Sequence, residues 1–490
     1  YRHTPSGADV ISVRAPQDDN KVFGITFRTP PSDSTGIAHI MEHSVLCGSR
    51  KYTSKEPFVE LLKGSLQTFL NAFTYPDRTC YPVASQNLQD YHNLINVYLD
   101  AVLHPRALKD PQVLQQEGWH YELEDLSQDI KYKGVVYNEM KGVYSSPEAL
   151  SQRHASRILF PDTIYSYDYG GDPPAIPDLT FEMFRNFHET YYHPSNARIF
   201  FYGDDDESSR LSLLSEYLDE FEKSSKNHNN TCSSSSNIQY QPKLNLSNSI
   251  HKFPYPVGED DTSGKHIVTM NWLLNDKELS EKESLSLVVL DHLLLATSSS
   301  PLYKNLIESR VGESVTGGGL SDELLQSTFS VGLKGVIESD VGRVEEIVNS
   351  TFEDILKSGG FEADAIRASV NSLEFQLREF NTGSFPKGLS VMLGIMKRWI
   401  YDISSPEDVL RFEKPLRELK EDLENGKPVL ENLIRDMFLE NKHRATIQLY
   451  PDSSMEKTQI EQEEARLKSV RDSMSQDDLL RVIEDTKALK

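Results

Sequence analysis

Cysteine is scarce in this sequence, and long uncharged hydrophobic runs are missing. The 490 residues include only three cysteines, Cys47, Cys80 and Cys232. These are too few and too scattered for a disulfide scaffold or a four-cysteine zinc site, so we expect a reducing compartment. The most hydrophobic stretch, residues 285–295, contains an aspartate and a histidine and is shorter than the roughly 18 apolar residues that a spanning helix needs. We therefore expect no membrane insertion.

Basic residues are also in short supply. The chain has 51 lysines and arginines against 75 aspartates and glutamates, which gives a net charge of −24 with neutral histidine. Such a surface would repel nucleic acid phosphates and anionic membranes, and it favours cationic ligands. Hydrophobic residues make up 38% of the chain, and the length indicates roughly two to four domains. The sequence thus predicts a folded, multidomain protein that binds no nucleic acid.

The first part of the chain, residues 1–222, alternates β-rich runs with amphipathic stretches, and we predict one αβ domain there. Strands are expected at residues 21–27 and 197–202, and helices at 88–102 and 181–191. From residue 223 to about residue 249 the composition changes to serine, asparagine and lysine. Such a stretch cannot bury enough apolar surface to fold, so we predict a low-complexity linker over residues 223–262.

Residues 263–454 are predicted to form a second αβ domain of the same fold without a metal motif. A strand is expected at 266–274, followed by a helix that Ser280 and Glu283 cap reciprocally. The similar size and order of elements in the two regions suggest an ancient duplication. Residues 455–490 are predicted to form a helical hairpin. Its last helix reaches the final residue without a glycine or proline stop, so we expect the chain to be part of a longer protein.

One segment, residues 36–48 (GIAHIMEHSVLCG), carries distinctive chemistry. A side chain among residues 33–35 could cap its start and Gly48 could end it, which predicts a helix of about three turns. At about 100° per residue, His39 and His43 lie about 40° apart on one face. Two imidazoles one turn apart can bind one Zn²⁺, which needs a third protein ligand and keeps a position for water in a catalytic site.

Glu42 lies on the flank of the same helix face. It could take a proton from that water as a general base, which is the inverted His-x-x-Glu-His arrangement of zinc peptidases. The alternative for so short a pattern is a surface helix with two unrelated histidines. An apolar stripe on the helix argues against this alternative, since it would anchor the helix and turn the site face toward a cleft. The stripe consists of Ile37, Ile40, Met41 and Leu46.

The third ligand is not determined by spacing. Several downstream carboxylates are available: Glu117, Glu122, Glu124, Glu139 and Glu148. We favour Glu139, because apolar neighbours would bury one side of its helix and aim it inward. Those neighbours are Val135, Val136, Met140 and Val143. A glutamate on a helix surface is the competing interpretation. Cys47, one turn beyond His43, is expected to be a buried thiol, since a helix cannot bend three successive turns onto one ion.

Four stretches closely resemble the presequence protease branch of the pitrilysin-type zinc peptidases. They are residues 36–50 (GIAHIMEHSVLCGSR), 55–65 (KEPFVELLKGS), 69–83 (FLNAFTYPDRTCYPV) and 134–142 (GVVYNEMKG). Further matches lie at 192–198, 203–206 and 319–326. By this resemblance His39 and His43 match the metal histidines, Glu42 matches the base and Glu139 the third ligand.

The resemblance also assigns Asn71 and Ala72 to a pair on an edge strand that holds the substrate backbone. An exposed strand edge can bind an extended peptide by main-chain hydrogen bonds. The alternative is an ordinary asparagine in a turn at a strand end.

The resemblance implies an α+β fold. Two similar αβ domains, each an antiparallel-rich sheet packed by helices, would form one half of a clamshell, followed by a helical hairpin that leads to a second half. In the family, the two halves close around a peptide chamber, and the second half supplies an arginine and a tyrosine that help to bind substrate. The C-terminal half of the same protein is therefore an expected partner.

The implied function is that of a zinc-dependent endopeptidase with one Zn²⁺ per chain. Its substrates would be short unstructured peptides, including cleaved cationic targeting presequences, in the mitochondrial matrix or the chloroplast stroma. The competing interpretation is a catalytically silent structural relative, such as a core subunit of a respiratory complex. The intact set His39, Glu42, His43 and Glu139 argues against it, because a silent relative has no chemical need to keep all four.

Overall fold

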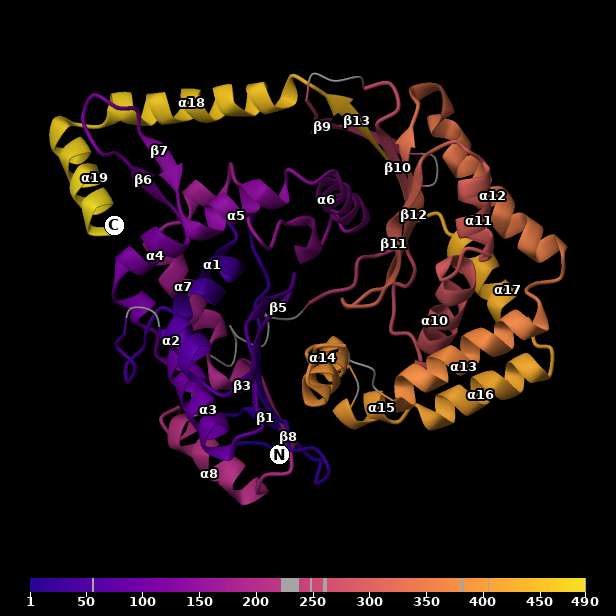
Figure 1. Cartoon of the computed structure of the whole chain (residues 1–490), viewed down its shortest axis with the longest axis horizontal. Helices are drawn as coiled ribbons and strands as arrows, with labels where there is room; N and C mark the ends of the chain where they lie inside the picture. Colours follow the sequence, from indigo (N-terminus) through magenta and orange to yellow (C-terminus); the bar gives the residue numbers. More distant parts are fainter. Residues whose placement is uncertain are drawn as a thin grey trace.

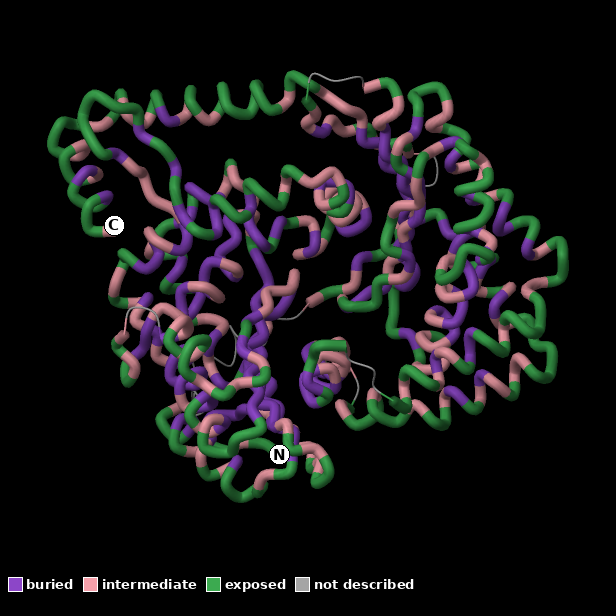
Figure 2. The backbone as a smooth tube through the Cα atoms, in the orientation of Figure 1, coloured by how far each residue is buried: buried purple, intermediate pink, exposed green. Residues whose placement is uncertain are grey.

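Two β-sheets, each covered by helices, form two lobes of the molecule (Figure 1). The computed structural model describes residues 1–54, 57–221, 238–246, 249–258, 262–379, 383–403 and 405–489. Buried residues concentrate along the two sheets and on the helix faces turned toward them (Figure 2). Among the described residues, no helix combines the length and the apolar character needed to cross a membrane.

The first sheet has six strands, with the path β1-β8-β2-β5-β3 and with β4 also paired to β5. The strands are β1 (Asp9–Arg14), β2 (Lys21–Arg28), β3 (Gln67–Leu70), β4 (Phe73–Thr74), β5 (Arg78–Ser85) and β8 (Ala197–Gly203). β1 runs parallel to β8, and β2 is antiparallel to both β8 and β5. β5 and β8 are buried along their whole length, because helices cover both faces of this sheet.

One face of the first sheet shares a hydrophobic core with three helices, α1 (Ile37–Val45), α3 (Leu88–Leu103) and α7 (Phe181–Tyr191). The remaining elements of this lobe are α2 (Pro57–Gly64), α4 (Pro111–Glu117), α5 (Val135–Val143), α8 (Glu207–Leu218) and the hairpin of β6 (His120–Glu122) and β7 (Lys131–Lys133). The strands expected at 21–27 and 197–202 and the helices expected at 88–102 and 181–191 are all present, each within one residue of its expected ends.

The second sheet repeats the topology of the first. Its path is β11-β12-β10-β13-β9, in which β9 is parallel to β13 and β10 is antiparallel to both β13 and β12. The strands are β9 (Ile250–Pro256), β10 (His266–Leu273), β11 (Ser314–Ser321), β12 (Thr328–Val336) and β13 (Arg444–Asp452). Its helices are α10 (Glu281–Leu295), α11 (Pro301–Glu308), α12 (Val341–Lys357), α13 (Ala363–Glu379), α15 (Pro406–Leu410), α16 (Glu413–Glu424) and α17 (Val429–Leu433).

The two lobes exchange one helix each. Helix α6 (Pro147–Leu159) packs on the second sheet through Leu150, and α14 (Lys387–Trp399) packs on the first sheet through Met392 and its neighbours. Both helices lie between the lobes in Figure 1. The α+β fold class with two similar sheets is therefore confirmed, and the two regions interlock.

The helical hairpin is also present, as α18 (Met455–Ser473) and α19 (Gln476–Leu489). Ser475 and Asp478 cap the second helix reciprocally. α18 spans from the second lobe to the first at the top of Figure 1.

The predicted linker is wrong in its second part. Residues 222–237 lie outside the described residues, but β9 (Ile250–Pro256) falls within the range 223–262 and pairs in parallel with β13. The second sheet therefore begins before residue 263. The other domain boundaries remain predictions.

Candidate metal centre

Helix α1 carries the two histidines on the face opposite its buried stripe. Ile37, Ile40, Met41 and Val45 are at most 6% exposed and belong to the core under the first sheet. This stripe repeats every three to four residues, as an amphipathic helix requires. His39, Glu42 and His43 are less buried. One side of the helix is therefore packed in the core, and the other side presents the polar side chains.

The start of α1 differs from the prediction. No side chain caps the helix, and its N-cap is Gly36 with φ of 70°. A Cβ atom on Gly36 would lie 2.6 Å from the Cα of Gly171, so both the left-handed backbone and the close contact require glycine. Asp33 instead accepts hydrogen bonds from Thr35. The helix ends at Val45, with Leu46 as its C-cap, before Gly48.

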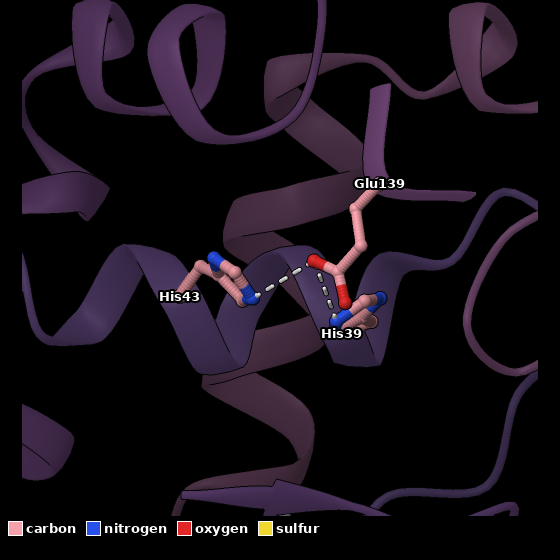
Figure 3. Close-up of side chains that lie close together, drawn as sticks. All are labelled: His39, His43 and Glu139. Atoms are coloured by element: carbon pink, nitrogen blue, oxygen red, sulfur yellow. Dashed lines mark ion pairs between the residues drawn. The ribbon is translucent and has the colours of Figure 1, made fainter. Parts of the chain in front are cut away.

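The structure brings His39, His43 and Glu139 together (Figure 3). One ligand atom from each residue lies within 4.8 Å of the others. The Nε2 atoms of His39 and His43 are 3.8 and 3.7 Å from Glu139 Oε2. Bonds of about 2.0–2.1 Å around a tetrahedral ion place ligand atoms about 3.3 Å apart, so a small inward movement would complete the site. Two imidazoles and one carboxylate are a donor set that fits catalytic Zn²⁺.

Glu139 reaches the group from helix α5. Two of the four alternative carboxylates are paired with lysines instead. Glu122 pairs with Lys133 at 2.6 Å, and Glu148 pairs with Lys334 at 3.1 Å. Glu124 is not part of the group that the described residues form. The expected burial of α5 is only half right, because Val136 and Met140 are buried, whereas Val135 and Val143 are 43% and 39% exposed.

Glu117, the remaining candidate, lies on the other side of His43. Its Oε2 is 3.4 Å from His43 Nδ1, and its side chain is only 10% exposed. A carboxylate on Nδ1 fixes the tautomer that leaves Nε2 free for a metal, and it raises the basicity of the ring. Burial lowers the pKa of His43, but the hydrogen bond to Glu117 and the charges of Glu42, Glu117 and Glu139 outweigh burial and leave this pKa raised.

Cys47 contacts the same carboxylate. Its Sγ lies 3.5 Å from Glu117 Oε1 and 3.6 Å from the backbone oxygen of His43. The thiol is half-buried rather than buried, which corrects the expectation, and it is not part of the His39, His43 and Glu139 group.

His39 has a different second partner. Its Nδ1 lies 3.0 Å from the carbonyl oxygen of Gly170, an acceptor that requires a proton on Nδ1 and leaves Nε2 free. Sequence reasoning did not find this partner, because residues 39 and 170 meet only in the folded chain.

Glu42 is held by the edge of the first sheet. The hydroxyl of Thr74, on β4, donates a hydrogen bond to Glu42 Oε2. Thr74 was not singled out from the sequence, although it lies within the matched stretch 69–83. The contact connects the predicted base directly to the strands that the predicted substrate pair borders.

Asn71 and Ala72 lie in the short break between β3 and β4, not within a strand. Asn71 is exposed and its carbonyl oxygen accepts a hydrogen bond from the Tyr98 hydroxyl at 3.2 Å, while Ala72 is 7% exposed. Among the described strands, β3 and β4 pair only with β5. The pair therefore lies beside the sheet edge, between two strands, and not on an edge strand as predicted. Its role in binding remains a prediction.

Two family models match this chain. The model described as insulinase (peptidase family M16) matches residues 27–143, which include the whole His39, His43 and Glu139 group, and the model described as peptidase M16 inactive domain matches residues 178–373.

Two curated relatives cover nearly all of the chain. "Presequence protease 1, chloroplastic/mitochondrial" of Arabidopsis thaliana is 52% identical over 100% of this chain and 45% of its own length. "Presequence protease, mitochondrial" of Danio rerio is 36% identical over 97% of this chain and 46% of its own length. The chain thus spans about half the length of these relatives. Their names agree with the predicted organelles.

Solved structures support the fold. The crystal structure of a protease from Helicobacter pylori matches with a TM-score of 0.70 at 16% identity and covers 92% of this chain and 99% of that one. At this identity the likeness describes the fold alone.

Proposed function

Because the chain belongs to peptidase family M16, we propose that it carries the metal centre of a zinc endopeptidase that cleaves short unstructured peptides. The observation that carries this proposal is the convergence of His39, His43 and Glu139 within 4.8 Å. Each imidazole is also oriented through its Nδ1 by a second partner. Surface side chains that meet by chance have no reason to share both features.

Zn²⁺ held by these residues would supply an acidified water and a polarised substrate carbonyl. Glu42 would accept the proton of the attacking water and later donate it to the leaving amine. The Thr74 hydroxyl bonded to Glu42 Oε2 would keep the carboxylate turned toward the reacting atoms. Glu117 and the Gly170 carbonyl would keep both Nε2 atoms directed at the metal.

The proposed substrate is an extended peptide that lies along the edge of the first sheet. Asn71 and Ala72 border β3 and β4 at that edge, where main-chain hydrogen bonds would read few side chains. The net charge of −24 favours cationic peptides. Together with the names of the relatives, this supports cleaved targeting presequences as substrates, in the mitochondrial matrix or the chloroplast stroma.

We also propose that a second, C-terminal half completes the peptide chamber. The chain spans about half the length of its relatives, and the site is formed from one lobe only. On this proposal the chain alone would hold metal and base but would bind peptide poorly, and misplacing a substrate by about 1 Å can cost about 10²-fold in rate.

The silent relative is less well supported. The family model that carries the word inactive matches residues 178–373, which exclude His39, Glu42, His43 and Glu139. The metal group lies in the range of the other model, residues 27–143, whose description does not contain that word.

The test is Glu42→Gln in the complete two-half protein. The amide is nearly isosteric but cannot accept a proton, so zinc content should stay unchanged while peptide cleavage falls by about 10²- to 10⁴-fold. A quenched arginine-rich peptide would report the rate. Wild-type cleavage by the Glu42→Gln protein would show that Glu42 is not the base.

A further inference from the structure

The segment from Asp168 to Asp172 lies between the two helices that carry the candidate metal ligands. Its Gly170 carbonyl contacts His39 Nδ1 at 3.0 Å. A Cβ atom on Gly170 would lie 3.0 Å from Cε of Met140, the residue after Glu139 on α5. One short segment is thus in contact with the first turn of α1 and with the ligand-bearing turn of α5.

Backbone hydrogen bonds tie this segment to the residues that precede α1. The Asp172 N–H donates to the Ser34 carbonyl at 2.8 Å, and the Asp168 N–H donates to Ser34 Oγ at 3.1 Å. Gly36 and Gly171 are packed closely enough that a Cβ atom on Gly36 would lie 2.6 Å from the Cα of Gly171. The position of the Gly170 carbonyl therefore depends on how Asp168 and Asp172 are held.

Arg153, on helix α6, holds both of these aspartates. Its Nη2 lies 2.7 Å from Asp168 Oδ2 and also pairs with Asp172 Oδ2. The side chains of Arg153 and Asp168 are only 14% and 5% exposed, so solvent screens this contact little. Removing a cationic partner from a buried carboxylate is destabilising, so the segment is expected to respond to the loss of Arg153, the more buried of its arginine partners.

Arg153 also contacts the end of the other ligand helix. Its guanidinium carbon lies 4.5 Å from the ring centroid of Tyr144, the C-cap of α5. Arg157, one turn further along α6, pairs with the same two aspartates at 2.8 and 3.5 Å. It is 38% exposed, and within the described residues no Arg157 contact with Tyr144 is present. Arg153 therefore contacts both the 168–172 segment, whose Gly170 carbonyl faces His39, and the C-cap of α5.

We propose that Arg153 is a positioning residue for the metal site: through Asp168, Asp172 and the Gly170 carbonyl it orients His39, and through Tyr144 it keeps α5 and Glu139 in register with His39. The inference rests on the proposed zinc centre. It adds Arg153, which lies on α6, the helix that packs on the second sheet. Arg153 touches no metal ligand and no substrate, so it acts only through the geometry of these contacts.

The test measures zinc affinity by competition with a chromophoric chelator, together with the visible spectrum of the Co²⁺-loaded chain. Arg153→Gln should weaken zinc binding by about 10- to 100-fold, the range known for residues that orient metal ligands, and should change the Co²⁺ spectrum. Arg157→Gln is the matched control from the same helix and should change both much less. Equal effects of the two variants, or unchanged affinity in Arg153→Gln, would overturn the inference.

A second variant covers the case in which Arg153→Gln does not fold. Ser34→Ala removes only the hydroxyl that accepts a hydrogen bond from the Asp168 N–H. It should weaken zinc binding by about 2- to 10-fold, the effect expected from the loss of one hydrogen bond. Unchanged affinity there would contradict the inference on its own. If the wild-type chain binds no zinc, the proposed function fails as well. If it binds zinc and no variant differs, only the positioning role fails.

Discussion

At the scale of single residues, the two histidines of α1 are oriented by acceptors of different strength. A neutral carbonyl at Gly170 faces His39, and a buried carboxylate at Glu117 faces His43. A carboxylate polarises the imidazole more than a carbonyl does. The carboxylate of Glu117 is one of the causes of the raised pKa of His43.

Replacing Glu117 should accordingly weaken the metal site. We expect Glu117→Gln to lower zinc affinity by about 10- to 100-fold, measured by chelator competition at pH 8. The pH matters because Glu117 also raises the pKa of His43, and protons compete with zinc for that ring at lower pH. Glu122→Gln, which removes a carboxylate paired with Lys133, is the control and should leave affinity unchanged. Equal affinities in both variants would refute a role for Glu117.

The sequence predicted only part of this site. The helical spacing of His39, Glu42 and His43 was sufficient to place the two histidines on one face of α1, because that geometry is local. Sequence spacing could not decide between Glu117 and Glu139 as the third ligand. Both carboxylates lie near His43, Glu117 at Nδ1 and Glu139 at Nε2. The contacts of Thr74 with Glu42 and of Gly170 with His39 could not be predicted from the sequence, because these residues meet only in the tertiary structure.

At the scale of helices and strands, the sequence pattern predicted the bounds of helices whose buried residues recur periodically. Helix α7 (Phe181–Tyr191) has the bounds that its apolar spacing predicts, and α10 starts at the predicted Ser280 and Glu283 capping box. Strand β9 was missed because its sequence, IHKFPYP, contains two prolines. Proline cannot donate to a ladder and is tolerated at sheet edges, which is where β9 lies.

The close packing of α14 on the first sheet depends on a glycine. A Cβ atom on Gly388 would lie 2.5 Å from Cδ1 of the Tyr202 ring, whereas one on Gly394 of the same helix meets no atom within 4 Å. Gly388→Ala should therefore reduce the free energy of unfolding by about 1–3 kcal/mol through overpacking. Gly394→Ala should raise it by up to about 1 kcal/mol, the helix propensity gain. Urea denaturation of the two variants tests this, and a stabilised Gly388→Ala chain would contradict the packing.

Helix α7 is joined to α3 through a buried histidine. His188 Nε2 lies 2.8 Å from the Val102 carbonyl, and burial lowers the pKa of His188 to about 4. An unfolded histidine titrates near about 6.5, so the unfolded chain binds more protons between these values. The stability from neutral His188 is thus complete above about pH 6.5 and is lost as pH falls toward 4.

The matching measurement is the free energy of unfolding against pH. In His188→Gln, the amide can still donate toward Val102 but does not titrate. We expect its stability to fall less steeply between pH 6.5 and 4, by a few kcal/mol at most, since one pKa unit corresponds to about 1.4 kcal/mol. Parallel pH profiles for wild type and variant would show that His188 does not contribute.

At the scale of the whole molecule, the two lobes cannot be separated without exposing their cores. α6 from the first region covers the second sheet, and α14 from the second region covers the first. Arg153, which pairs with the segment beside His39, lies on the exchanged helix α6. A repeated sheet topology was suggested by the sequence, but the exchange was not, because amphipathic helices do not specify which sheet they cover.

The helical hairpin is docked on the lobe that carries the metal group. Leu467 of α18 and Ile483 of α19 are 6% and 8% exposed and belong to the core of that lobe. Lys141, two residues after Glu139, pairs with Glu463 of α18 at 2.9 Å. Exposed ion pairs of this kind contribute little by themselves, so the buried apolar contacts dominate the docking.

The most direct test of the central claim is the zinc content of the purified chain after extensive dialysis, measured by inductively coupled plasma mass spectrometry. The wild type and Glu42→Gln should each hold one Zn²⁺ per chain, because Glu42 is outside the His39, His43 and Glu139 group. His43→Ala should hold almost none, since two remaining ligands rarely retain zinc. A wild-type chain without zinc, or stoichiometric zinc in His43→Ala, would contradict the assignment.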